Sequence, residues 1–304
     1  MKFELYNFIH PFVQKTDDKK LIAIPLAILA IALLIVVFTT IKTGSPVALG
    51  MDFVGGTQFS VTTNLTEEQL EDMFSEYPLN NIRISGTRAI LQFSQLQGGE
   101  LESLEKMIHG NTIFRDIEQR QVEPTYSKEL QKSALCAVLL SFCGMAAVVF
   151  IMFRKVVPSF AVLISSATDI IVPLAFMNIL GMELTLGAVA ALLMLIGYSV
   201  DSDILLTNKV LKRSGNLDDK VAGAMRTGLL MTTTTIAAFL VMFLVSTYLH
   251  YIVPSIPPIP LLSQISLIVL VGLIIDIFST WFLNTGILRM YVKSPKSRKG
   301  GRRV

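Results

Sequence analysis

Six long apolar stretches constrain this chain more than any other feature of its sequence. Each stretch is close to or above the roughly 20 residues that an α-helix needs to cross the hydrocarbon core of a bilayer. They are residues 21–41, 133–153, 159–180, 184–207, 228–249 and 262–290. Hydrophobic residues make up 52% of the chain and charged residues 16%, well to the apolar side of a soluble domain. The sequence therefore predicts an α-helical membrane protein with six transmembrane helices.

The first apolar stretch follows Lys15, Lys19 and Lys20, as the core of a secretion signal also would. Signal cores contain about 7–15 apolar residues and end at a cleavage site, whereas residues 21–41 form a longer run. We interpret this run as a retained anchor. The expected plan is one helix, a polar domain and five further helices. The predicted parts are a cytoplasmic N-terminus (1–20), the first helix (21–41), an extracytoplasmic domain (42–132), a five-helix membrane domain (133–291) and a basic cytoplasmic tail (292–304).

Lysine and arginine occur in alternate connections between the apolar stretches, and such clusters mark the cytoplasmic side. The short connections 181–183 and 250–260 contain neither residue. Both termini are therefore predicted to be cytoplasmic, in a multi-pass protein of the cell membrane. The net charge of +3 comes largely from these clusters, which face membrane lipid, so no nucleic-acid partner is predicted. The clusters contain Lys15, Lys19, Lys20, Arg154, Lys155, Lys209, Lys212, Arg213, Lys220, Arg226 and the tail 293–303.

The polar stretch 42–132 alternates between strand and helix patterns. Thr66 and Gln69 form a capping-box signature at the start of its first amphipathic segment. Strands are expected at 53–63, 82–85, 89–93 and 117–125, and helices at 66–74 and 101–108. The order β-α-β-β-α-β predicts an α+β ferredoxin-like domain, a fold that hosts many functions. We find no nucleophile triad, phosphate-binding loop or cluster of metal ligands in it. We therefore expect a binding or lever module, with no enzyme activity and no cofactor.

Carboxylates inside the apolar stretches are the strongest functional signal in the membrane part. Asp169, Asp201 and Asp276 lie well inside three of these stretches, and an aspartate at a helix centre costs about 2.5–3.5 kcal/mol. Arg226 starts the fifth stretch and is expected within reach of Asp201. These four residues are candidates for a proton relay. The alternative is structural, with the aspartates hydrogen-bonded to the threonines of 232–235 or to Asn284.

Asp203 is two residues beyond Asp201, which places the two side chains about 200° apart around a helix. They cannot both face the same partner. We expect Asp203 to extend toward the cytoplasmic interface, as long or charged side chains near helix ends do.

Three stretches, taken together, resemble the SecF family of the SecD/SecF group, within the resistance-nodulation-division superfamily. Residues 50–57 (GMDFVGGT) resemble the family's G-x-D-F-x-G-G-T element, and residues 196–201 (IGYSVD) resemble its I-G-Y-S motif followed by a polar pair. Arg226 and Thr227 match an Arg-Thr element at the start of the fifth helix. The order and spacing of the three make the resemblance specific. The motif residues besides Arg226 are Asp52, Gly55, Gly56, Gly197 and Tyr198.

This resemblance implies an auxiliary subunit of the Sec protein-export machinery. It implies a SecD partner, association with a SecYE-type translocation channel, contact with exported unfolded polypeptides, and use of the proton gradient. The chain departs from bacterial members, which usually carry Asn-Asp where Asp201 and Ser202 stand here. Its connection between Asp201 and Arg226 also looks shorter. These departures suit an archaeal-type SecF.

Two other functions remain open at this point. A small-molecule or lipid exporter of the same superfamily would share the one-plus-five plan, although such proteins generally carry two units in one chain. An intramembrane aspartyl protease would also carry aspartates in its helices. Those enzymes resemble one another in a Gly-x-Gly-Asp element, whereas Tyr198, Ser199 and Val200 precede Asp201 here.

Overall fold

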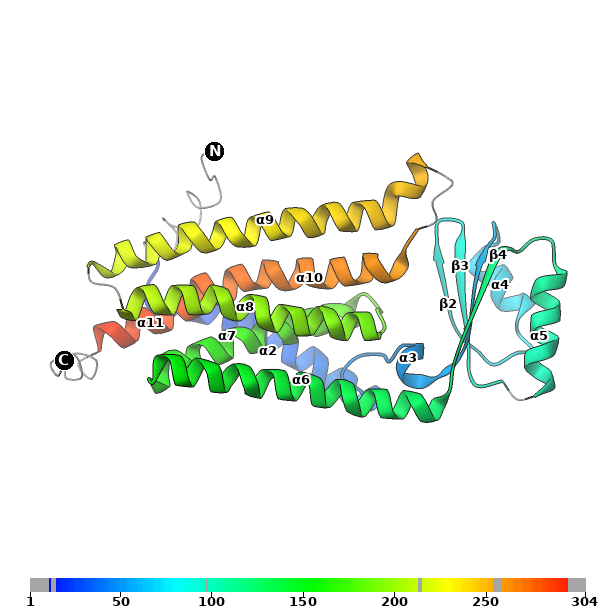
Figure 1. Cartoon of the computed structure of the whole chain (residues 1–304), viewed down its shortest axis with the longest axis horizontal. Coiled ribbons are helices and arrows are strands. Elements are labelled where there is room, and N and C mark those ends of the chain that lie inside the picture. The colour runs from blue at the N-terminus through cyan, green and yellow to red at the C-terminus, as the bar shows by residue number, and fades with distance from the viewer. Residues whose placement is uncertain (1–10, 12–14, 97, 213–214, 254–257, 295–304) are drawn as a thin grey trace.

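The computed structural model describes residues 11, 15–96, 98–212, 215–253 and 258–294. Within this part of the chain, six helical segments are long and apolar enough to cross a membrane. They run side by side, and a small α+β domain lies at one end of the bundle (Figure 1). The spans are α2 (Asp18–Thr43), α6 (Pro124–Phe153), α7 (Val156–Ile179), α8 (Leu186–Lys212), α9 (Leu217–Ile252) and a last span made of α10 (Pro260–Phe278), η1 (Ser279–Asn284) and α11 (Thr285–Lys293). The predicted six-helix membrane protein is confirmed.

The spans form an inner and an outer group. About half of α7, of α8 and of the last span is buried within the chain, whereas α2, α6 and α9 leave most of their length exposed. Many exposed side chains of the outer group are aliphatic, for example Leu34 on α2 and Leu140 on α6, which are 71% and 75% exposed. Such surfaces suit contact with lipid tails or with another membrane helix.

The α+β domain has the predicted ferredoxin-like topology. Its sheet has the order β2-β3-β1-β4, and each pair of neighbouring strands is antiparallel. The capping box forms as predicted, with the Thr66 backbone N–H donating to Gln69 Oε1 at 3.0 Å. The elements are β1 (Gly56–Thr62), α4 (Glu67–Met73), β2 (Leu79–Ser85), β3 (Arg88–Phe93), α5 (Gly99–Gly110) and β4 (Arg115–Val122).

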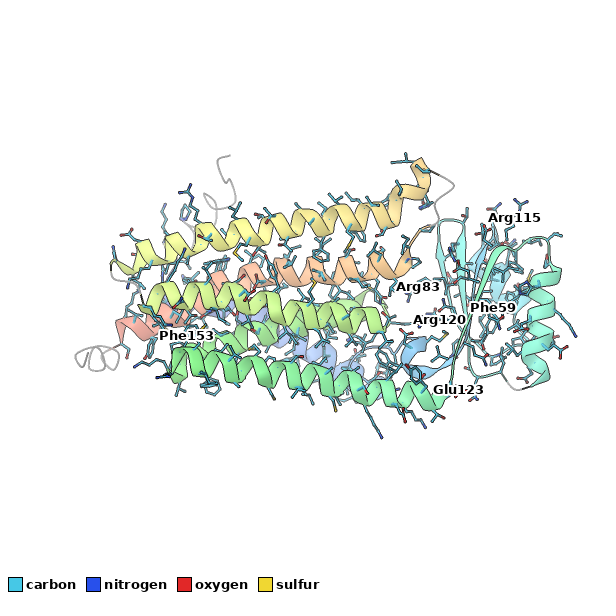
Figure 2. The ribbon with its side chains drawn as sticks, in the orientation of Figure 1. Phe59, Arg83, Arg115, Arg120, Glu123 and Phe153 are labelled. Atoms are coloured by element: carbon cyan, nitrogen blue, oxygen red, sulfur yellow. The ribbon has the colours of Figure 1, made fainter. Side chains whose placement is uncertain are left out.

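The two faces of this sheet differ in character because alternate residues of a strand point to opposite sides. One face packs against α4 and α5 through a core that includes Phe59, Phe74 and Leu104, all fully buried. The other face carries polar and charged side chains and looks toward the membrane helices, with Arg83 and Arg120 between the sheet and the helix ends (Figure 2).

Two boundaries differ from the sequence-based expectation. A one-turn helix, α3 (Met51–Val54), precedes β1 and takes up the first two residues of the stretch predicted as a strand. Helix α6 begins at Pro124, so the predicted boundary between residues 132 and 133 falls inside one continuous helix. Proline suits the first turn of a helix, but residues 124–132 are too polar to extend the apolar pattern on which the boundary was based. As a result, α6 connects β4 to the membrane domain without a flexible linker.

Some predicted features lie outside the described residues. They are most of the N-terminal segment 1–20, Arg213, and the tail beyond residue 294. Two of the basic clusters belong to the α6–α7 and α8–α9 connections. Both connections lie at the end of the bundle opposite the α+β domain (Figure 1).

Gly56 provides a direct test of the family motif's structural role. Its φ is +128°, and a Cβ atom there would lie 2.2 Å from the carbonyl oxygen of Phe93. We expect Gly56→Ala to lower the free energy of unfolding by about 1–3 kcal/mol through strain and overpacking. Thermal unfolding of the purified protein measures this. The matched control is Gly99→Ala, where nothing lies within 4 Å of the added methyl group; equal unfolding midpoints for the two variants would contradict the assignment.

Candidate functional site

Three aspartates from three helices converge in the interior of the membrane domain. Asp169 lies on α7, Asp203 on α8 and Asp276 on α10, and none is more than 1% exposed. Their carboxylates are close enough for their charges to repel one another. We call these three residues the carboxylate cluster.

Hydroxyl groups connect Asp169 to two neighbouring helices. Ser199 of α8 donates a hydrogen bond to Asp169 Oδ2. Ser279, at the start of η1, donates to Asp169 Oδ1 at 2.7 Å. The α7 carboxylate is therefore held by residues of α8 and of the last span at once.

The other two carboxylates share a second set of partners. Asp203 Oδ1 accepts hydrogen bonds from Ser165 Oγ at 3.2 Å and from Asn284 Nδ2 at 2.8 Å. Thr280 Oγ1 donates to Asp276 Oδ1 at 3.2 Å and also lies beside Asp203. A continuous polar path thus links Asp276 to Asp203 across α8 and the last span.

A π-helical turn builds much of this site. Element η1 begins three residues after Asp276, and all six of its residues are buried. Three of its side chains bind the cluster, namely Ser279, Thr280 and Asn284. Single π turns inside α-helices occur frequently at functional sites. Through Ser279 and Asn284, this one turn reaches carboxylates on two other helices, α7 and α8.

The cluster lacks a counter-charge within this part of the chain. Among the described residues, no lysine, arginine or histidine forms an ion pair with any of the three aspartates. Asp203 Oδ2 and Asp276 Oδ2 are buried and have no hydrogen-bond partner there. Three uncompensated negative charges in an apolar interior are prohibitively costly. Burial therefore disfavours the fully charged form of the cluster.

The predicted relay residues separate into two groups. Asp169 and Asp276 lie in the cluster, whereas Asp201 and Arg226 are exposed on the surface of this chain, and neither forms an ion pair with a described residue. The expected contact between Asp201 and Arg226 is absent among the described residues. The role of all four in a relay stays a prediction.

The expectation for Asp203 was wrong, because its side chain is fully buried and does not extend to the interface. Asp203 is four residues beyond Ser199, so both face the same side of α8. Ser199 binds Asp169 from that side. The spacing of Ser199 and Asp203 predicts that they share a face of α8, but the packing of α7 and η1 decides that this face is buried.

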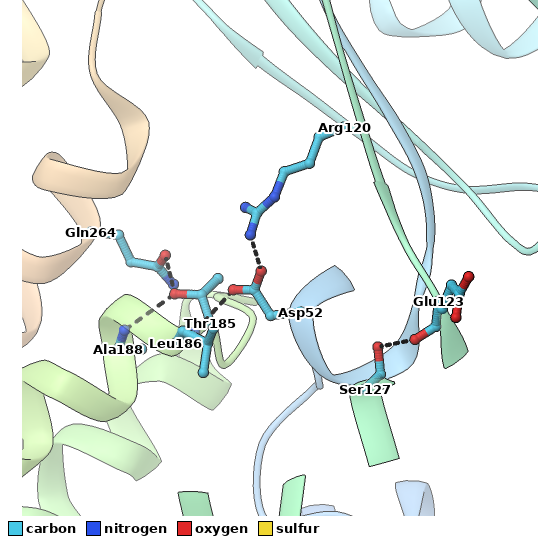
Figure 3. Close-up of polar contacts among 8 residues, drawn as sticks. All are labelled: Asp52, Arg120, Glu123, Ser127, Thr185, Leu186, Ala188 and Gln264. Carbon is cyan, nitrogen blue, oxygen red and sulfur yellow. Dashed lines mark hydrogen bonds and ion pairs between the residues drawn. The ribbon is translucent and has the colours of Figure 1, made fainter. Parts of the chain in front are cut away.

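The first family motif forms the joint between the α+β domain and the membrane domain. Asp52 Oδ1 forms an ion pair with Arg120 Nη2 of β4 at 2.8 Å. Asp52 Oδ2 accepts a hydrogen bond from the backbone N–H of Leu186 at 3.0 Å (Figure 3). Leu186 is the first residue of α8, and a carboxylate is favourable at a helix N-terminus. Asp52, 7% exposed, thus connects the sheet to the helix that carries Asp203.

Further contacts hold the same joint. Thr185 Oγ1 accepts the backbone N–H of Ala188 at 3.2 Å and donates to Gln264 Oε1 of α10 at 3.1 Å (Figure 3). Gly50 N donates to Leu184 O at 2.9 Å, and a Cβ at Gly50 would lie 3.0 Å from that oxygen. Two motif residues therefore have a structural explanation: Gly50 allows close backbone approach at the joint, and Asp52 connects its two sides.

The second motif has one buried and one exposed side. Tyr198 packs against the interior, and Ser199 binds Asp169. Gly197 and Asp201 are four residues apart on the exposed side, and nothing lies within 4 Å of a Cβ at Gly197. This side of α8 has room for the close approach of another helix.

The sequence of this chain is similar to those of known protein-export membrane proteins. The family model described as protein export membrane protein SecD/SecF, C-terminal, matches residues 103–294. The protein-export membrane protein SecF of Methanolacinia petrolearia is 41% identical over 95% of this chain and 98% of its own length. The protein of the same description from Haloferax volcanii is 40% identical over 94% of this chain and 98% of its own.

The crystal structure of SecDF, a translocon-associated membrane protein from Thermus thermophilus, superposes with a TM-score of 0.73 at 19% sequence identity. It covers 95% of this chain, which spans 39% of that longer chain. The fold and the site define a multi-pass membrane protein with a ferredoxin-like domain and a polar interior. The chain belongs to the SecD/SecF family of protein-export membrane proteins.

Proposed function

We propose that this chain is an auxiliary subunit of the Sec protein-export machinery, which acts with a SecD partner and uses the proton gradient to promote translocation. The observation that carries the proposal is its similarity to SecF proteins over nearly the whole chain, together with the buried carboxylate cluster. The superposition with a translocon-associated protein supports the fold.

In this proposal the cluster takes up and releases protons, and the α+β domain responds. A change of charge at Asp203 alters the packing of α8 against η1, because Asn284 binds its carboxylate. The N-terminus of α8 is bound to Asp52, which is paired with β4. One charge crossing about 100 mV supplies roughly 2.3 kcal/mol, comparable to the hydrogen bonds at this joint.

The exposed side of α8 is the proposed contact with SecD. An aspartate facing lipid in the middle of a span costs about 2.5–3.5 kcal/mol, so Asp201 requires a polar environment from another chain. Gly197 beside it permits close helix packing. We propose that Arg226 also lies near this interface. A SecYE-type channel and the exported polypeptide are proposed to contact the α+β domain. The basic clusters support cytoplasmic termini and an extracytoplasmic α+β domain.

Asp201→Asn tests the proposed extension of the relay to the partner. Asparagine keeps the size of the side chain and can still form hydrogen bonds, but it is neutral and cannot take up or release a proton. We expect export assistance to fall by about 100-fold or more, as for loss of a proton-transferring group, while SecD still copurifies. A complementation assay in cells lacking the natural protein measures this. Full activity of the variant would remove Asp201 from the relay.

Affinity purification from native membranes in mild detergent, followed by mass spectrometry, tests the function itself. We expect recovery of a sister subunit with the same one-plus-five plan and of Sec channel components. Recovery of this chain alone or as a homo-oligomer, combined with small-molecule or lipid flux by the purified protein, would replace the export proposal with that of an exporter.

A further inference from the structure

A cavity of ≈ 400 Å³ lies between the α+β domain and the ends of the membrane helices. Its walls come from β2, from the α7–α8 connection, and from the ends of α9 and α10 nearest the α+β domain. They include Arg83, Leu180, Phe243, Thr247, Ser263 and Leu267. The cavity thus begins where the apolar helices end and reaches about two turns along them.

Arg83 is the only charged residue among the described residues that line this cavity. It is half-buried and has no ion pair or hydrogen bond from its side chain within the described part of the chain. Its neighbours on the same sheet face differ, since Arg88 pairs with Glu118 at 2.5 Å and Arg120 with Asp52 at 2.8 Å. A partly desolvated, unpaired guanidinium attracts an anion, and its planar donors match phosphate in particular.

The remaining walls suit the rest of a lipid molecule. Phe243 and Leu267 form an apolar wall that continues toward the helices. Thr247 Oγ1 and Ser263 Oγ lie 2.7 Å apart, which bridges α9 and α10 and places hydroxyl groups beside the charged mouth. Tyr248 and Tyr251, 50% and 69% exposed, follow on α9. Exposed tyrosines at the ends of spans mark the level of lipid headgroups.

From this arrangement we propose that the cavity binds the phosphate headgroup of an anionic membrane lipid. Arg83 binds the phosphate, and an acyl chain lies against Phe243 and Leu267. A lipid in this position contacts β2 and two membrane spans at once, so it would stabilise one position of the α+β domain over the bilayer surface. This inference does not depend on the export function, because it rests on the cavity and the unpaired arginine alone.

Lipid binding to the purified full-length chain tests the proposal by native mass spectrometry. We expect phosphatidylglycerol to bind about tenfold more tightly than phosphatidylcholine, and Arg83→Gln to abolish this difference. The control Arg115→Gln makes the same charge change on the exposed strand β4 outside the cavity and is expected to keep it. Wild-type lipid preference in Arg83→Gln would overturn the proposal.

A second variant keeps the test informative if Arg83→Gln fails to fold. Leu267→Trp fills the apolar part of the cavity and leaves Arg83 in place, and it is expected to weaken phosphatidylglycerol binding at least about tenfold. Unchanged lipid binding in this variant would contradict the site. Glycerol phosphate, which has the headgroup without acyl chains, should not displace the lipid at equal concentration. Displacement by it would show a soluble phosphate ligand and overturn the lipid assignment.

Discussion

Asp203→Asn is expected to abolish the dependence of protein export on the proton gradient. Asparagine can still accept hydrogen bonds from Ser165 and from Asn284, so the fold should persist. It removes one of three carboxylates whose charges act on one another, and with it the charged partner of Asn284 in η1. Loss of a proton-transferring group lowers rates by about 100-fold or more. Export of a reporter protein, measured with and without a protonophore, gives the gradient-dependent part.

The matched control for this prediction is Asp219→Asn. It makes the same chemical change on an exposed aspartate at the start of α9, outside the cluster. The control should respond to the protonophore as the wild type does, whereas Asp203→Asn should show only the residual export seen without this protein. If Asp203→Asn kept more than about half of the gradient-dependent rate, the aspartate would be a structural hydrogen-bond acceptor only.

The second large effect is expected at the joint between the two domains. Asp52→Ala removes both the ion pair with Arg120 and the acceptor for the first N–H of α8. Arg120→Ala removes the ion pair alone, and the Arg120 side chain is 60% exposed. Solvent screening at the exposed Arg120 end limits this ion pair to about 1 kcal/mol, whereas loss of an acceptor for a backbone N–H costs about 1–3 kcal/mol. Asp52→Ala should therefore impair export much more strongly than Arg120→Ala.

A double-mutant comparison separates the two contacts. Asp52→Asn retains an acceptor for Leu186 and loses the charge, so it should resemble Arg120→Ala in the export assay. The double variant Asp52→Ala/Arg120→Ala should be no worse than Asp52→Ala. If instead Arg120→Ala and Asp52→Ala were equally defective, the ion pair rather than the contact with α8 would connect the domains.

The sequence predicts the fold because its signals are local and long. Each span is a continuous apolar run, and each strand or helix of the α+β domain has its own period, so the β-α-β-β-α-β order could be derived. The start of α6 at Pro124 could not be predicted, because the first turns of this helix are polar and do not show the apolar pattern of a span. Length and hydropathy identify the part of a helix that lies in the bilayer but not the part outside it.

The candidate site could be predicted only in part. Asp169 and Asp276 were identified because an aspartate within an apolar run is costly wherever it points. Which of Asp201 and Asp203 faces inward depends on the rotation of α8 about its axis, and that rotation is set by the packing of η1 and α7. The π turn has no sequence signature. The contact between Asp52 and Leu186 joins residues far apart in the chain, which no local pattern reveals.

The most direct test of the proposed role of the carboxylate cluster is proton uptake by vesicles that contain this chain and its copurified partner. After a proton gradient is imposed, the wild type and Asp219→Asn should take up protons at the same rate, and Asp203→Asn should match vesicles without protein. Uptake by Asp203→Asn at the wild-type rate would contradict a role for the cluster in proton coupling.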